Sequence, residues 1–196
     1  MVTFKIGRFR IGISIFFAAF FAVIIFVSEN TLLLYGIFAM LCHELGHFVA
    51  MLLSGCPARG FYLLLGRLII VPARGIAMRR AELPVHLGGI AANFFCAAIF
   101  LALGNVTMCL TNAVIAAYNA LPAGELDGGA VLMYFLNRTL TPKKAHAVGL
   151  AASFAVAFVL FTAGFVMLLK GYANPTLLFS GIYITAQNIR NIRYTK

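Results

Sequence analysis

Charged residues are scarce in this chain of 196 residues: they make up 10% of it, and only five of them are acidic. Hydrophobic and aromatic residues make up 63%. Such a composition leaves too little polar surface for a soluble domain, and runs of about 18 or more apolar residues are typical of membrane helices. The sequence therefore predicts a bundle of helices in lipid and excludes an ordinary water-soluble globule.

The chain also lacks a C-x-x-C pair, an internal repeat and a polar linker. Most of its four cysteines lie in or beside apolar runs, where free thiols serve as small packing residues. Nothing outside the apolar runs is long enough to form a second domain. We therefore expect residues 1–196 to form a single intramembrane domain, with no separate soluble regulatory domain.

Positive charges gather in the short segments between the apolar runs. Of the 15 Lys and Arg residues, all but Lys170 fall on segments predicted to lie on the same side of the membrane. Positive residues accumulate on the cytoplasmic side, so we expect a multi-pass protein, of a bacterial cell membrane, with both termini in the cytoplasm. The basic, aromatic-rich face of a nucleic-acid-binding protein is missing, and we expect no nucleic-acid partner.

Six apolar segments predict about six transmembrane helices, so the predicted fold class is an all-α polytopic membrane protein. The predicted spans are residues 11–27, 31–53, 83–103, 105–136, 145–169 and 175–189. After the second span, residues 61–72 favour either a short β-hairpin on the cytoplasmic side or an apolar segment at the membrane interface. The sequence leaves these two alternatives open.

The second span contains the pattern H-E-x-x-H at His43, Glu44 and His47. On a helix the two histidines share one face, so both can bind one zinc ion while Glu44 acts as general base on a water at the metal. A chance occurrence would bury polar side chains in lipid, at about 2.5 to 3.5 kcal/mol for each central charge. The pattern therefore predicts a site for one zinc ion.

A catalytic zinc ion needs a third protein ligand and an open position. Asp127 is the best candidate, because its predicted depth of about 14 Å resembles the depth of about 9 Å for His47. Residues 105–136 as one helix would measure about 48 Å, more than the hydrocarbon core of about 30 Å, and Pro122 and Gly124 predict a break. The alternative is a Pro-kinked hairpin among the headgroups, in which Asp127 forms an ordinary turn.

These motifs resemble those of the site-2 protease family of intramembrane metalloproteases, which pairs H-E-x-x-H with N-x-x-P-x-x-x-L-D-G on a later helix. The second motif matches at Asn119, Pro122, Leu126, Asp127 and Gly128. A glycine-rich segment like G-G-P-L-A-N matches in part at residues 88–93, where Ile90 replaces the proline. Gly124 and Glu125 depart from the small or apolar residues that usually precede L-D-G, so the resemblance gives Glu125 no role.

The resemblance covers about residues 31–136 and implies a zinc-dependent intramembrane endopeptidase. It implies that His43, His47 and Asp127 bind zinc and that Glu44 is the general base. The expected substrate is a membrane-anchored protein, cut in or next to its membrane segment near the cytoplasmic face. The strand pair would hold the extended substrate by strand addition.

The resemblance also implies substrate contacts. Asn119 would position the substrate or the oxyanion, and Pro122 and Asn93, which belong to the matching motifs, are predicted as further substrate-binding residues. The small size and the site near the cytoplasmic face are most similar to the sporulation-type branch, whose members release a sigma factor from a membrane-bound precursor. Regulatory partners in the membrane are therefore expected as well.

Two other functions compete with this interpretation. A membrane zinc transporter also places His and Glu on membrane helices, but it predicts several sites along a path, and this chain has four histidines and one plausible site. A catalytically inactive relative that acts as a scaffold is the third alternative, against which the intact Glu44 argues. The sequence leaves the substrate, the activating signal and the oligomeric state open.

Overall fold

The computed structural model describes residues 2–6, 9–15, 31–56, 58–64, 67–72, 75–124, 126–172 and 174–194. The chain divides into two compact units, Met1–Ala117 and Tyr118–Lys196, and each is described by itself. Most of the predicted first span, from residue 16 onward, and Glu125 lie outside the described residues.

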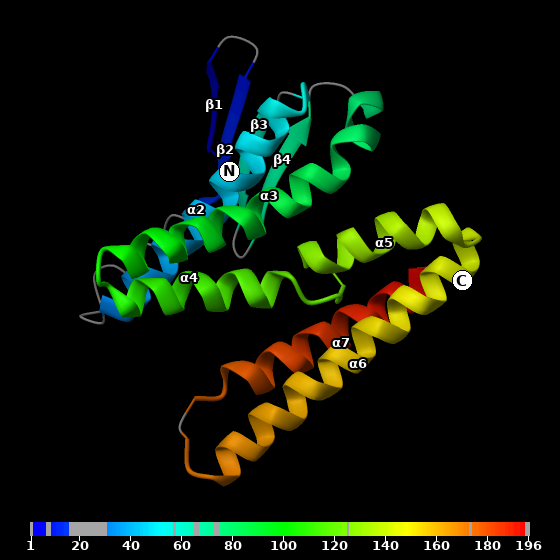
Figure 1. The fold of residues 1–196 in the computed structure, drawn as a ribbon. Helices are drawn as coiled ribbons and strands as arrows, with labels where there is room; N and C mark the ends of the chain where they lie inside the picture. Colours follow the sequence, from blue (N-terminus) through cyan, green and yellow to red (C-terminus); the bar gives the residue numbers. More distant parts are fainter. Residues whose placement is uncertain are drawn as a thin grey trace. The chain divides into compact units, whose positions relative to one another are not determined.

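The helices of the first unit are α2 (Thr31–Leu53), α3 (Gly75–Ala102) and α4 (Val106–Asn119), the last of which ends two residues into the second unit. Helices α2 and α3 pack along each other (Figure 1). Glycines permit the close approach, since a Cβ on Gly46 would lie 2.3 Å from the carbonyl oxygen of Gly88. Small residues at such contacts are typical of helix pairs in membranes.

A four-stranded sheet accompanies these helices. Its strands are β1 (Val2–Ile6), β2 (Phe9–Ile13), β3 (Ala58–Leu64) and β4 (Arg67–Pro72), in the order β1-β2-β3-β4. Strands β1 and β2 pair antiparallel, β2 and β3 parallel, and β3 and β4 antiparallel. The antiparallel pair β3–β4 lies where the sequence favoured either a hairpin or an interfacial segment. The side of the membrane on which it lies stays a prediction.

The second unit consists of α5 (Asp127–Thr139), α6 (Pro142–Leu169) and α7 (Thr176–Tyr194). Helices α6 and α7 form an antiparallel hairpin (Figure 1). Their contact also depends on glycine, because a Cβ on Gly164 would lie 2.4 Å from the backbone nitrogen of Leu178. A small buried core of this unit joins Ala123, which precedes α5, to Ala157 of α6 and Ile184 of α7.

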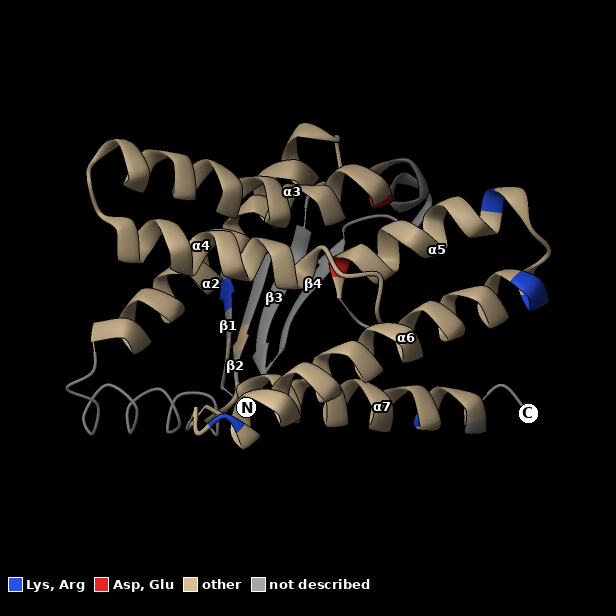
Figure 2. Cartoon of the chain, turned by 60° about the horizontal axis from the view of Figure 1, so that its bottom comes forward, with Lys and Arg blue, Asp and Glu red and all other residues tan. Residues whose placement is uncertain are grey.

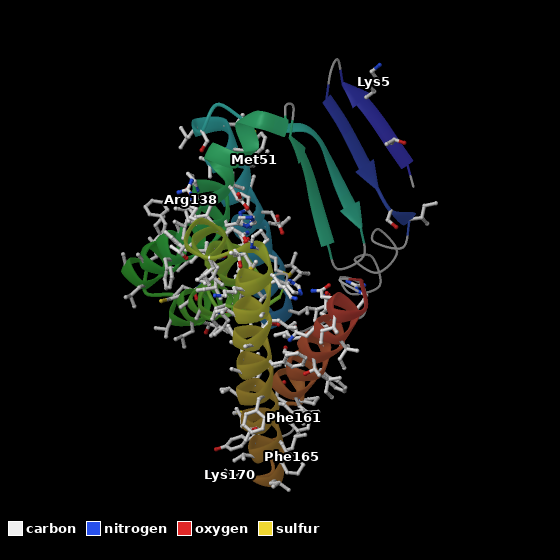
Figure 3. The ribbon with its side chains drawn as sticks, turned by 90° about the vertical axis from the view of Figure 1, so that its right-hand side faces the viewer. Lys5, Met51, Arg138, Phe161, Phe165 and Lys170 are labelled. Atoms are coloured by element: carbon white, nitrogen blue, oxygen red, sulfur yellow. The ribbon has the colours of Figure 1, made fainter. Side chains whose placement is uncertain are left out.

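Three helical segments of the described chain are long and apolar enough to cross a membrane: Thr31–Leu53, Ala81–Ala102 and Pro142–Leu169. They agree with the predicted second, third and fifth spans. Many apolar side chains on them are exposed, as expected for surfaces that face lipid. On α6, for example, the stacked rings of Phe161 and Phe165 lie near the end that carries Lys170 (Figure 3).

The predicted fourth span is broken where the sequence places Pro122 and Gly124. Helix α4 ends at Asn119 and α5 begins at Asp127. Gly124 has a φ of +46°, a left-handed conformation that glycine adopts without steric cost. The helix is therefore interrupted between Asn119 and Asp127. The predicted first span differs at its start, because β2 continues to Ile13.

Candidate metal centre

The H-E-x-x-H pattern lies on α2, with both imidazoles on its buried side. His43 is 6% exposed and His47 is 9% exposed. One turn of helix separates them, so their rings stack edge to face with centroids 4.6 Å apart. The structure thus brings together the two histidines that the sequence pairs as metal ligands.

Hydrogen bonds to α3 fix the tautomer of each histidine. His43 Nδ1 lies 2.8 Å from Asn93 Oδ1, and His47 Nδ1 lies 2.7 Å from the carbonyl oxygen of Val85. Both oxygens can only accept, so both Nδ1 atoms carry the proton and donate it. Metal-binding histidines are usually held in this way, which leaves the other ring nitrogen for the metal.

The two Nε2 atoms therefore meet with their lone pairs rather than with a proton between them. They lie 3.1 Å apart. Two neutral imidazoles protonated at Nδ1 repel at this distance, and a cation between them removes the repulsion. Zinc binds histidine nitrogen at about 2.0–2.1 Å, which puts two tetrahedral ligands about 3.3 Å apart. The donor atoms and their separation both fit zinc.

Helix α3 approaches the two rings closely because it has a glycine opposite them. A Cβ on Gly89 would lie 2.6 Å from Cε1 and Nε2 of His47 and 2.8 Å from Cε1 of His43. His86, one turn earlier on α3, is half-buried, and its ring centroid lies 6.3 Å from that of His47. The glycine-rich segment thus has a steric role at the histidine pair.

Asn93 is completely buried, and its amide is used within the protein. Besides accepting from His43, it donates from Nδ2 to the carbonyl oxygen of Ala39 at 2.8 Å and to Asn112 Oδ1 at 3.0 Å. These contacts favour a role of Asn93 in positioning His43. The substrate contact that the sequence predicts for Asn93 stays a prediction.

Glu44 follows His43 on α2 and is half-buried. Neighbouring residues on a helix point about 100° apart, so Glu44 does not share the direction of the two imidazoles. Glu44 is thus next to the histidine pair in the helix but is not a third metal ligand, which is what a general base at this motif requires.

In the second unit, Asp127 is the first residue of α5 and is 9% exposed. Figure 2, in which acidic residues are red, shows how few of them the described ribbon carries. The N-terminus of a helix has a partial positive charge and stabilises a carboxylate. Gly128 permits the local turn, because a Cβ there would lie 2.1 Å from the carbonyl oxygen of Ala120.

The remaining predicted residues surround this turn. Asn119, the last residue of α4, is half-buried, and Pro122 is exposed. Gly124 packs near a buried polar pair on the α6–α7 hairpin, in which Ser153 Oγ donates to Asn188 Oδ1 at 2.8 Å. The substrate contacts predicted for Asn119 and Pro122 stay predictions.

Sequence reasoning missed two groups of the centre, the Val85 carbonyl, which orients His47, and Asn112, which holds Asn93. It noted Gly89 only as part of a glycine-rich segment and not for the space that it leaves for both rings. Asn112 carried a visible signal, as a polar residue in an apolar helix.

No family model matches this sequence, and no curated protein sequence matches it. Solved structures do match. One of them is the site-2 protease from Methanocaldococcus jannaschii, which is 19% identical to this chain and superposes with a TM-score of 0.65. The match covers 96% of this chain and 94% of that one. The chain therefore shares the fold of that site-2 protease over nearly its whole length.

Proposed function

We propose that this chain is a zinc-dependent intramembrane endopeptidase of the site-2 protease kind. The observation that carries the proposal is the histidine pair, in which the Nε2 atoms of His43 and His47 face each other across 3.1 Å on a helix apolar enough to cross a membrane. The likeness of fold to a site-2 protease supports it independently.

Asp127 is the third zinc ligand in this proposal. A catalytic zinc ion needs a third protein ligand beside two histidines, and by resemblance the motif that contains Asp127 supplies it. Two histidines and a carboxylate, with a fourth position open, form a known type of catalytic zinc site. Asp127 lies at the N-terminus of α5, where the helix dipole favours a negative charge.

Zinc held there would supply Lewis acidity and lower the pKa of a water. Glu44 accepts a proton from the attacking water as the new carbon–oxygen bond forms at the scissile carbonyl. It then gives the proton to the leaving nitrogen as the carbon–nitrogen bond breaks. Asn93 and the Val85 carbonyl keep both imidazoles oriented, so the two rings do not have to turn during the reaction.

The proposed substrate is a membrane-anchored protein, cut in or next to its membrane segment near the cytoplasmic face. A membrane helix has its amides hydrogen-bonded internally, so the substrate must unwind before attack. By resemblance to the sporulation-type branch, we extend the proposal to a membrane-tethered transcription or sigma factor. The proposal puts both termini in the cytoplasm, as the charge pattern of the sequence predicts.

The test compares the wild type with Glu44→Gln and Glu82→Gln, each co-expressed with candidate membrane substrates. Glu82 is a half-buried acid on α3 outside the motifs, so its variant makes the same chemical change elsewhere. Glu44→Gln should retain zinc and lose cleavage, while Glu82→Gln should retain both. Cleavage by Glu44→Gln would overturn the mechanism, and a wild type without zinc would overturn the site.

The same variants distinguish the alternatives. A transporter would move zinc into liposomes, and this flux would persist in Glu44→Gln. A scaffold would bind its membrane partner without cutting it in the wild type. Either result would replace the protease proposal.

A further inference from the structure

We propose that Asn112 of α4 is a positioning residue for the metal centre, acting on His43 through Asn93. This inference rests on the proposed function, in which His43 is a zinc ligand. The three side chains form one hydrogen-bonded series across α2, α3 and α4, all within the first unit. Asn112 lies in neither of the sequence motifs that predict the centre.

Every hydrogen bond of the series has a fixed donor and acceptor, because the backbone carbonyls of Met108 and Ala39 accept from the two asparagine amides. Asn112 Nδ2 donates to the carbonyl oxygen of Met108 at 2.9 Å, so its Oδ1 must face Asn93. Asn93 Nδ2 donates to this Oδ1 and to the carbonyl oxygen of Ala39, so its own Oδ1 must face His43. A carbonyl cannot donate. The only arrangement that satisfies every group therefore puts the proton of His43 on Nδ1.

Burial makes this arrangement the only favourable one. Asn93 and Asn112 are both 0% exposed, so water does not replace a lost partner. A reversed amide at either residue would set two oxygens or two NH₂ groups against each other in an apolar interior. Asn112 thus keeps Asn93 from turning, and Asn93 keeps the Nε2 lone pair of His43 directed at the metal. Leucine at position 112 would fill space but leave Asn93 without this partner.

The first measurement is zinc affinity of the purified protein in detergent, by competition with a chelating dye. Asn93→Leu should weaken zinc binding by about 10- to 100-fold, the usual effect of losing a partner of a metal ligand. Asn112→Leu should weaken it by up to about 10-fold, since it acts one step further away. The double variant should match Asn93→Leu alone, because the effect of Asn112 passes through Asn93.

Two variants control for simple damage to α4. Asn112→Asp keeps an acceptor for Asn93 and should bind zinc more tightly than Asn112→Leu. Thr111→Val removes a neighbouring hydroxyl that donates only to its own helix, to the Thr107 carbonyl at 2.8 Å among the described contacts, and should bind zinc like the wild type. If Asn112→Leu does not fold, the comparison of Asn112→Asp with Thr111→Val still tests the series.

The second measurement needs no zinc. In protein labelled with ¹⁵N-histidine, the Nδ1 proton of His43 should give an exchange-protected signal in the wild type. Asn112→Leu should make that proton exchange faster, while the Nδ1 proton of His47, held by Val85, stays protected. Equal zinc affinity and unchanged exchange in Asn112→Leu, or additive losses in the double variant, would overturn the inference. Failure of the wild type to bind zinc would instead overturn the proposed function.

Discussion

Gly89 lies so close to His47 that a methyl group on its Cα would be 2.6 Å from both Cε1 and Nε2 of the imidazole. Real Cβ atoms do not approach other atoms to this distance, so any larger residue at position 89 must move the ring or the helix. The neighbouring His43 ring is also within reach, at 2.8 Å. The space for the histidine pair thus depends on the absence of a side chain on α3.

We therefore predict that Gly89→Ala lowers zinc affinity by about 10- to 100-fold, as changes around metal ligands commonly do. Gly36→Ala is the matched control. Gly36 lies on α2 of the same unit, and a Cβ there would meet nothing within 4 Å. Zinc titration of both variants measures the effect. Equal affinity in Gly89→Ala and Gly36→Ala would contradict the steric role.

Zinc should stabilise the folded protein through the histidine pair. A ligand that binds only the folded state at about 100 times its Kd adds about 2.7 kcal/mol of stability. We expect zinc to raise the midpoint of thermal unfolding in the wild type but not in His43→Ala or His47→Ala. His146→Ala, which changes a half-buried histidine of α6 in the second unit, should keep the shift. A shift of the same size in all variants would place the zinc elsewhere.

The H-E-x-x-H motif and the break before α5 were predictable from the sequence because both depend on local patterns. The spacing of His43 and His47 puts them on one face of any helix, and Pro122 and Gly124 interrupt any helix in which they fall. The choice of Asp127 as the third ligand rests on its predicted depth and on the L-D-G motif of the resemblance, and that assignment stays a prediction. These features do not depend on which helices become neighbours.

The partners of the histidines were not predictable, because they depend on how α3 and α4 turn toward α2. The Val85 carbonyl has no side-chain signal, and Asn112 is far from His43 in the sequence. The strand β2 was missed for another reason. Its residues 11–13 are also the start of an apolar run, and short runs of this kind fit helix and strand alike. These residues form a strand because they pair with β3, which follows in the sequence only after α2.

Asp127→Asn should remove the third zinc ligand with little loss of folding. The amide has the shape of the carboxylate, and the lost interaction with the N-terminus of α5 is worth only about 0.3–1 kcal/mol. Metal analysis of the purified protein should find well below one zinc ion per chain. Glu82→Gln, which neutralises an acid on α3, should keep the full amount. Full zinc occupancy in Asp127→Asn would remove Asp127 from the ligand set.

The buried polar pair of the α6–α7 hairpin allows a prediction about stability in the second unit. Ser153 is 2% exposed and Asn188 is 1% exposed, and the Nδ2 of Asn188 has no hydrogen-bond partner among the described residues. Ser153→Ala leaves the Asn188 oxygen unpaired as well, because it removes the hydroxyl that donates to it. We expect this single change to cost about 1–3 kcal/mol, the range for a buried polar group left without its partner.

The double variant Ser153→Ala with Asn188→Leu should recover most of that loss, since replacing both partners by apolar groups removes the unpaired atoms altogether. Thr185→Val is the control, because the Thr185 hydroxyl donates to the Gly181 carbonyl of its own helix, at 2.8 Å, and its loss should change little. Denaturant unfolding in detergent measures all three variants. A double variant less stable than Ser153→Ala would contradict this prediction. It would mean that the Asn188 side chain stabilises the hairpin through a polar contact other than the one with Ser153.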